Sequence, residues 1–377
     1  MEFRDLKKQY QVLKQDIDKS ILEVCENANY ISGKQVAELE KELADYVGVK
    51  HCITCANGTD AISIALMTWN IGEGDAVFVP DFTFFSSGEC PAGEGATPIF
   101  VDVDAETYNI NPECLEKAVQ NVLNEKKYVP KAVVAVDLFG QCAEYDRIRE
   151  ICEKYNLLLL EDAAQGFGGS IQGKMACSFG DIATTSFFPA KPLGCYGDGG
   201  AIFTDRDDWA ALIRSLCVHG KSGEDKYNNI QLGRNSRLDT IQAAVLKVKL
   251  QAFREYEVID VNKAATWYND KLKDLNIQLP YVKNGYVSSW AQYTIRLAEG
   301  TDRGKIQKRL KEAGIPSMIY YVKPMHLQGA FSDTDSVNAD CPVTEKLCQT
   351  VLSLPIHPYM DEDIIAYISN TLKEIIR

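Results

Sequence analysis

The chain has 377 residues, of which 46% are hydrophobic and 25% are charged, and this composition predicts a globular protein with a large core. A formal net charge of −13 argues against nucleic acid or an anionic membrane as a partner, because a phosphate backbone attracts a basic face. The chain has no run of about 18 or more apolar residues, so we expect no membrane span, and its polar opening segment favours a cytoplasmic location over export.

Twelve cysteines and four histidines raise the question of a metal or redox site. Cys52 and Cys55 form a C-x-x-C pair, but the pair lies in an apolar stretch, and no second pair follows at a zinc-like spacing. The histidines are scattered and form no H-E-x-x-H motif. We therefore expect two reduced thiols in a buried strand, and no metal site.

Between residues 58 and 204, short apolar runs alternate with polar, helix-like segments, a pattern typical of parallel strands with crossover helices in a doubly wound α/β sheet. The expected strands are 76–79, 98–101, 132–136, 157–160, 182–186 and 201–204. Asp81, Asp137, Asp162 and Ser186 stand at or just beyond the ends of four of them. Ligands bind beyond the carboxyl ends of such strands, so these residues predict a pocket.

The texture of the sequence changes after Arg237. Residues 238–272 predict a long helix with few breakers, and we place a domain boundary within it. The prediction is a large domain over 1–250 and a smaller α+β domain over 251–377. In the smaller domain we expect a strand at 292–297 and helices at 303–313 and 361–376.

Residues 56–66 form a small polar turn that leads into an apolar helix. The free N–H groups and the dipole of a helix N-terminus bind phosphate, Gly58 lets the anion approach closely, and Thr59 offers a hydroxyl. An ordinary N-cap needs the same residue types, and the segment by itself favours that simpler interpretation.

Two further segments offer a carboxylate and an amine. Asp162 follows an apolar strand, where an acid often caps the next helix. Alternatively, Asp162 is the counter-ion of a pyridine nitrogen: its negative charge keeps that nitrogen protonated, so that the ring acts as an electron sink. A lone lysine is usually a solvated surface charge, but Lys191 lies between Pro189 and Pro192 in a glycine-rich loop. The prolines restrict the backbone, which suits an amine held in place as a nucleophile.

A fourth segment, 233–244, places polar residues at the start of the long helix, and by itself it is an ordinary charged helix start. Together, the four segments resemble the DegT/StrS-type sugar aminotransferases, a branch of the aspartate aminotransferase (fold type I) superfamily. The resemblance covers essentially the whole chain and rests on Asn57-Gly-Thr-Asp60, Glu161-Asp-Ala-Ala-Gln165, Ser186-Phe-Phe-Pro-Ala-Lys191 with Gly197-Asp-Gly-Gly200, and Asn235-Ser-Arg-Leu-Asp239. It implies a large domain with a mostly parallel sheet, a smaller C-terminal domain, and pyridoxal 5′-phosphate as cofactor.

The resemblance also implies roles for individual residues. Lys191 would be the catalytic lysine that holds the cofactor as a Schiff base, Asp162 the partner of the pyridine nitrogen, and Gln165 a contact to the ring hydroxyl. The phosphate ligands would be Gly58, Thr59 and Ser186, and Phe84 would stack on the ring. Family members share their active sites across a homodimer, so Asn235 would reach the phosphate of the neighbouring protomer. Substrate contacts from the partner would be Arg237, Tyr320, Tyr321 and His326.

The expected reaction transfers an amino group from glutamate to a nucleotide-linked keto sugar. The chain looks most like the UDP-2-acetamido-3-keto-glucuronate aminotransferases of surface polysaccharide synthesis, which includes lipopolysaccharide O-antigen, and Arg237 could bind the sugar carboxylate. However, Tyr320 stands where that branch carries a histidine, and His326 lies in a run more typical of neutral deoxysugar enzymes. An aminotransferase for a 3- or 4-keto-6-deoxysugar is therefore the alternative.

The sequence also bears on three other functions. A regulatory protein that binds the cofactor without turnover stays possible, whereas Lys191 argues against the related dehydratases, which have histidine there. Residues 168–174 match the phosphate-binding pattern G-x-x-x-x-G-K, but Met175 follows where a hydroxyl would hold magnesium. No complete G-x-G-x-x-G connects a strand with a helix, which argues against a Rossmann dehydrogenase.

Overall fold

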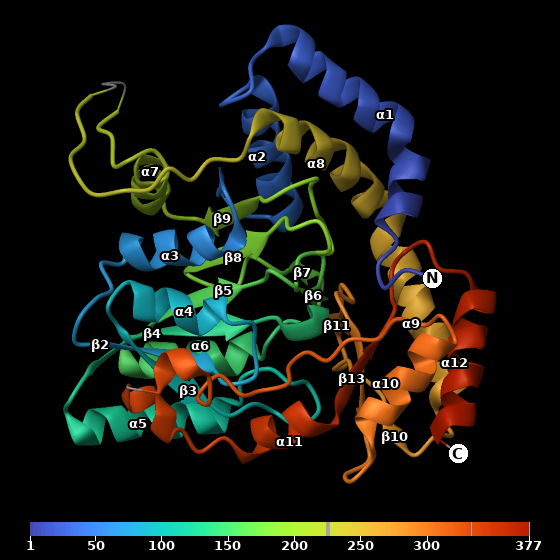
Figure 1. Ribbon diagram of the computed structural model, residues 1–377. Helices are drawn as coiled ribbons and strands as arrows, with labels where there is room; N and C mark the ends of the chain where they lie inside the picture. The colour runs from blue at the N-terminus through green and yellow to red at the C-terminus, as the bar shows by residue number, and fades with distance from the viewer. Residues whose placement is uncertain (224–226, 333, 377) are drawn as a thin grey trace.

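The computed structural model describes residues 1–223, 227–332 and 334–376 (Figure 1). A seven-stranded sheet lies at its centre, in the order β1-β9-β8-β5-β4-β2-β3. Its strands are β1 (His51–Cys55), β2 (Asp75–Pro80), β3 (Thr97–Val101), β4 (Val129–Val136), β5 (Leu158–Asp162), β8 (Ile182–Ser186) and β9 (Gly200–Thr204). Neighbours from β3 to β8 pair in parallel, whereas β9 is antiparallel to both β8 and β1. The six predicted strands and the predicted strand around Cys52 and Cys55 are all present.

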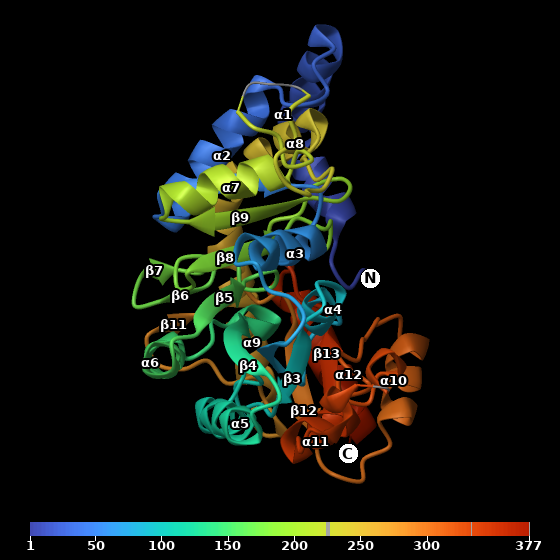
Figure 2. The same cartoon turned by 90° about the vertical axis from the view of Figure 1, so that its left-hand side faces the viewer.

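Helices cover both faces of this sheet, as a doubly wound fold requires. One face packs against α2 (Lys34–Val47), α5 (Pro112–Glu125), α6 (Tyr145–Tyr155) and α8 (Thr240–Ala252), and the other against α3 (Gly58–Thr68), α4 (Ser86–Gly93) and α7 (Asp207–Leu216). Figure 2 shows α3 and α4 on one side of β5 and β8, and α6 on the other. Alternate residues of β4 supply the two cores: Val133 and Ala135 face one, Val134 and Val136 the other.

The predicted long helix is present but is not regular throughout. A π-helical segment, Phe253–Glu257, separates α8 from α9 (Val258–Leu272). The N-terminal helix α1 (Leu6–Asn27) packs along α8 (Figure 1). The π-helical segment turns Glu257 into the interior, where its carboxylate accepts hydrogen bonds from Gln9 of α1 and from Tyr359 near the C-terminus. Through Glu257, this irregular turn therefore links α1 to the segment around Tyr359.

The C-terminal part has a core of its own. Its buried residues, from Val261 to Leu372, form a hydrophobic cluster distinct from the two cores of the large sheet. The elements are an antiparallel sheet of β10 (Ile277–Gln278), β12 (Tyr293–Leu297) and β13 (Val351–Leu354), with α9, α10 (Arg303–Glu312) and α12 (Glu362–Ile376), while α11 (Pro342–Thr350) leads into β13. The predicted strand and both predicted helices are present. The domain boundary at residue 250 stays a prediction, which this separate core supports.

A third, small sheet joins β6 (Ser170–Ile171), β7 (Lys174–Met175) and β11 (Tyr286–Val287). The segment that matched the phosphate-binding pattern forms the β6–β7 hairpin, so it does not connect a strand with a helix as a P-loop does. No helix in the described ranges is both long and apolar enough to cross a membrane.

Candidate active site

The predicted pocket edge brings several of the predicted site residues together. Asp162 is the last residue of β5, and Ser186 is the last residue of β8. These strands pair in parallel, so both side chains stand at the same edge of the sheet. Helices α3 and α4 begin at this edge as well, since Gly58 packs against Ser186 and Ser87 binds Asp162.

The first turn of α3 forms a cradle of hydrogen-bond donors. The side chain of Asn57 accepts a hydrogen bond from the N–H of Asp60 at 2.8 Å, so an ordinary N-cap is present at Asn57. Gly58 and Thr59 follow the cap, where N–H groups have no acceptor within the helix. The hydroxyl of Thr59 lies 2.8 Å from that of Ser86. These donors lie at the positive end of the helix dipole, which suits a phosphate group.

Asp162 is a buried carboxylate that accepts two hydrogen bonds. Its oxygens accept hydrogen bonds from the hydroxyl of Ser87 at 3.1 Å and from the N–H of Ala164 at 3.2 Å. The chain then runs through turns over residues 164–168, so the alternative that Asp162 caps a helix is wrong. Burial raises the pKa of Asp162, while the N–H of Ala164 and the charge of Lys191 act in the opposite direction.

Lys191 lies in a turn that its own backbone closes, because its N–H donates to the carbonyl of Phe188 at 2.8 Å. Desolvation lowers the pKa of the Lys191 amine, Asp162 raises it, and the positive charge of Arg4 lowers it further. The amine is therefore partly desolvated, as its position between two prolines predicted. It lies within electrostatic reach of the Asp162 carboxylate.

Gln165 is held from both ends of its amide. Its oxygen accepts a hydrogen bond from the N–H of Phe139 at 2.8 Å, and its nitrogen donates to the hydroxyl of Tyr321 at 3.2 Å. Burial raises the pKa of Tyr321, so its hydroxyl stays protonated. This hydrogen bond places Tyr321 beside Gln165 of its own chain, whereas the resemblance implied a contact from the partner protomer.

Two phenylalanines near the end of β2 differ sharply in exposure. The ring of Phe82 is 1% exposed and packs edge-on against Tyr321, with ring centroids 5.9 Å apart. The ring of Phe84 is 54% exposed, although it stands just before Ser86 and Ser87 of the site. Phe84 thus presents an uncovered aromatic surface at this edge, while Phe82 belongs to the core.

The predicted phosphate contact Asn235 and the predicted substrate contacts Arg237, Tyr320 and His326 differ in burial. Asn235 is exposed and Arg237 is half-buried, on a segment whose Ser236 hydroxyl accepts a hydrogen bond from the N–H of Ala56. Tyr320 is half-buried. His326 is buried, with its backbone N–H 2.8 Å and its Nδ1 2.7 Å from the two oxygens of Asp81. This placement does not support direct contact between His326 and a substrate.

Sequence reasoning missed Ser86, Ser87 and Arg4. The two serines follow a predicted strand closely, so their proximity to the pocket edge was a usable signal. Arg4 contacts the Lys191 loop by donating from Nη2 to the carbonyl of Pro192 at 3.1 Å. A separation of 188 residues gives no local signal for that contact.

One group of potential metal ligands occurs in the part of the chain that the structure describes. Asp81, His326 and Cys341 place a carboxylate oxygen, a ring nitrogen and a thiol within 4.8 Å of one another. Both oxygens of Asp81 already accept hydrogen bonds from His326, so these two residues have a structural reason to lie together without a metal ion. Cys52 and Cys55 are buried free thiols whose pKa burial raises, as two reduced thiols in a strand would be. The absence of a metal site stays a prediction.

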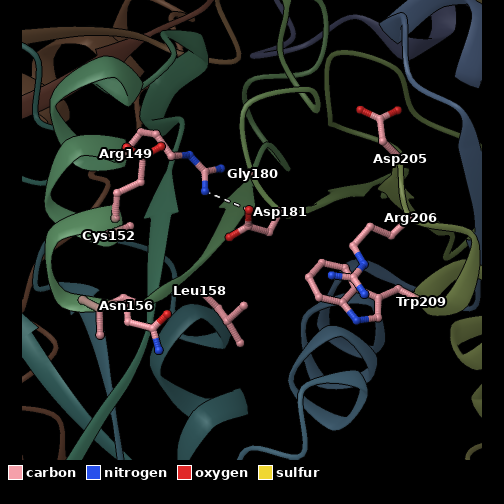
Figure 3. A pocket seen from close by; sticks show the side chains of 11 residues that line it. Arg149, Cys152, Asn156, Leu158, Gly180, Asp181, Asp205, Arg206 and Trp209 are labelled. Carbon is pink, nitrogen blue, oxygen red and sulfur yellow. Dashed lines mark hydrogen bonds and ion pairs between the residues drawn. The ribbon is translucent and has the colours of Figure 1, made fainter.

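A large surface hollow, of about 580 Å³, lies away from this site (Figure 3). It includes Leu158 at the start of β5 and Asp181 just before β8, so it occupies the opposite edge of the sheet. Its cations are already engaged: Arg149 pairs with Asp181 at 2.8 Å, and the Arg206 guanidinium lies 4.3 Å from the centre of the Trp209 ring. The carboxyl ends of the strands remain the better candidate.

Comparisons with known proteins point to one protein family. The model of the DegT/DnrJ/EryC1/StrS aminotransferase family matches residues 11–373. The UDP-2-acetamido-2-deoxy-3-oxo-D-glucuronate aminotransferase of Pseudomonas aeruginosa is 44% identical over 372 residues, 99% of each chain. A pleiotropic regulatory protein of Geobacillus stearothermophilus is 39% identical over 376 residues, 99% of this chain and 98% of its own. The crystal structure of a DegT DnrJ EryC1 StrS aminotransferase from Brucella abortus has a TM-score of 0.96 and 46% identity, covering 100% of this chain and 99% of its own.

The fold and the site define a class, the pyridoxal-phosphate-dependent sugar aminotransferases of fold type I. Within that class, the chain belongs to the DegT/DnrJ/EryC1/StrS aminotransferase family.

Proposed function

We propose that this protein transfers the amino group of glutamate to a UDP-linked 3-keto sugar, with 2-acetamido-3-keto-glucuronate as the favoured sugar, for surface polysaccharide synthesis. The observation that carries the proposal is the buried Asp162 within electrostatic reach of the partly desolvated Lys191. The likeness to the aminotransferase of Pseudomonas aeruginosa supports the sugar. The cytoplasmic location stays a prediction from the sequence.

The residues at the sheet edge fit pyridoxal phosphate. Gly58, Thr59 and Ser186 would hold the phosphate, and the lack of a Cβ on Gly58 lets the first turn of α3 lie directly against Ser186. Phe84 would cover one face of the ring, and Gln165 would stand beside the ring hydroxyl. When bound, this cofactor supplies a carbonyl that takes up amines and a ring that withdraws an electron pair from the adjoining carbon.

The protein side chains then have distinct tasks. The Asp162 carboxylate would accept a hydrogen bond from the protonated ring nitrogen, and its negative charge would keep that nitrogen positive, while the hydroxyl of Ser87 and the N–H of Ala164 hold the carboxylate in place. Lys191 would hold the cofactor covalently between turnovers. Once free, its Nζ would take a proton from the α-carbon of glutamate, and in the second half-reaction it would deliver a proton to the sugar carbon that receives nitrogen. A lowered pKa helps, because the amine must be neutral to accept a proton.

A homodimer with shared sites is part of the proposal. The segment that leads to Asn235 and Arg237 exposes large apolar side chains: Ile230 is 66% exposed and Leu232 is 90% exposed. Apolar surface of this kind marks a protein interface. A partner subunit over this segment would bring Asn235 toward the phosphate and Arg237 toward the sugar carboxylate.

The test combines purified protein, glutamate, and a panel of UDP- and dTDP-linked keto sugars. We expect formation of 2-oxoglutarate and an amino sugar, fastest with the UDP-linked 3-keto-glucuronate, and no product with Lys191→Ala. A higher kcat/KM for a neutral 3- or 4-keto-6-deoxysugar would favour the alternative enzyme. Cofactor binding without conversion of glutamate would favour a regulatory protein, the function named for the relative from Geobacillus stearothermophilus.

A further inference from the structure

The N-terminal segment that precedes α1 reaches the candidate active site at two points. The ring of Phe3 contacts the ring of Tyr320 edge-on, with centroids 6.4 Å apart. The next residue, Arg4, donates from Nη2 to the carbonyl of Pro192, the neighbour of Lys191. Figure 1 shows the N-terminus beside the loops of the C-terminal part. The segment therefore carries a guanidinium group to the loop of the proposed cofactor lysine.

This guanidinium group has too few acceptors for its position. Its Nη1 atom is buried and has no hydrogen-bond partner among the described residues. Among the acidic groups, Glu257 raises the pKa of Arg4 most. The Glu257 carboxylate, however, accepts its hydrogen bonds from Gln9 at 2.7 Å and from Tyr359 at 2.6 Å. In the described part of the chain, Arg4 forms no ion pair within 4.0 Å. A guanidinium has five donors, and a buried donor of a charged group that lacks an acceptor is costly, so the free Nη1 favours an anionic ligand.

The surroundings of Arg4 favour an anion further. Burial lowers the pKa of Arg4 yet leaves it charged, since a guanidinium does not lose its proton in proteins. The pKa of His357 falls to about 4, chiefly because the ring is buried and in part because of the nearby positive charge of Arg4. His357 is thus neutral at pH 7 and does not compete for an anion. Tyr320, whose ring contacts that of Phe3, offers a hydroxyl but no charge.

We propose that Arg4 binds a substrate carboxylate in the active site. The planar fork of donors on a guanidinium matches the two oxygens of a carboxylate, and Nη1 is the donor left free for it. Two substrates of the proposed function carry such a group, the amino donor glutamate and the uronate sugar, so this inference rests on that function. Arg4 would add a cation from the N-terminal segment to the one proposed at Arg237.

The experiment measures each half-reaction separately with Arg4→Gln and Arg4→Lys. The protein loaded with pyridoxal phosphate reacts with glutamate alone, and the aminated form reacts with a uronate or a neutral keto sugar. We expect Arg4→Gln to raise the half-saturating concentration of at least one carboxylate substrate roughly tenfold to a hundredfold, with the neutral sugar unaffected. Arg4→Lys should recover part of the loss. Lys7→Gln, which removes an exposed cation of α1, is the matched control.

The arms separate the two sources of carboxylate, since a loss with glutamate identifies the donor and a loss with the uronate identifies the sugar. Calorimetric titration with glutarate, a dicarboxylate without an amine, adds a readout independent of turnover, and weaker binding by Arg4→Gln would support the donor. Equal losses with carboxylate and neutral substrates would overturn the proposal, because Arg4 would then act only by positioning the Lys191 loop. Unchanged half-saturation with all substrates would overturn it too. Failure of the wild-type protein to aminate any sugar would instead refute the proposed function.

Discussion

A Cβ atom on Gly58 would lie 2.7 Å from the Cβ of Ser186. The first turn of α3 and the end of β8 therefore touch where phosphate is proposed to bind, and Gly58→Ala must push them apart. We predict that this variant binds pyridoxal phosphate at least tenfold more weakly, measured by titration of the apoprotein. Gly93→Ala is the control, because a Cβ at Gly93 in α4 meets no atom within 4 Å. Equal affinity of both variants would contradict the phosphate site.

Asp162→Asn tests the proposed counter-ion. The variant cannot keep the ring nitrogen positive, so both half-reactions should slow roughly a hundredfold or more. The apoprotein should keep its stability, because burial already raises the pKa of Asp162 and disfavours the charged form. Stopped-flow rates and thermal unfolding of the apoprotein give the two readouts. A nearly wild-type rate would limit Asp162 to a structural role.

Asp137 and Glu161 form a buried pair of acids, and we predict that this pair makes the free energy of unfolding depend on pH. Burial and the Glu161 charge raise the pKa of Asp137, and burial raises the pKa of Glu161 from 4.5 to about 7. Three backbone N–H groups bind Glu161, while Oδ2 of Asp137 has no other partner, so the folded pair holds a proton that the unfolded chain releases. Stability from a raised pKa is complete at low pH and is lost as the pH rises from 4.5 through about 7.

Asp137→Asn should reduce this pH dependence, because the amide can donate a hydrogen bond to an ionised Glu161 and does not titrate. We expect the free energy of unfolding of the variant, relative to wild type, to increase by up to about 3 kcal/mol between pH 4.5 and 7. Urea unfolding of the apoprotein across this range measures the difference. Asp146→Asn, at an exposed position of α6, removes the same formal charge and should show no such trend. Parallel curves for wild type and Asp137→Asn would refute proton sharing.

The proposed homodimer predicts complementation between two inactive chains. Lys191→Ala removes the amine of a chain's own site, and Arg237→Ala removes a contact proposed to enter the neighbouring site. In randomly mixed dimers half of the molecules are hybrids with one intact site, so activity should recover to about a quarter of wild type. The assay is run after unfolding and refolding of the mixture, with size measured by light scattering. An active monomer would exclude shared sites.

The sequence by itself determined the class of the fold and the proposed chemical centre. Apolar runs with polar ends marked the strands, and glycine and proline around Lys191 marked an unusual lysine, because period and turn chemistry are local properties. Family motifs then connected Asp162 and Lys191 to a cofactor, and the comparisons confirmed the family.

The tertiary structure decided what depends on residues distant in the chain. It showed that turns rather than a helix follow Asp162, that His326 is buried against Asp81, and that Tyr321 binds Gln165 of its own chain. It also brought Arg4 to Pro192 across 188 residues. Local patterns specify how each segment folds, but hydrogen bonds and burial between segments arise only when the cores and the two ends of the chain pack together.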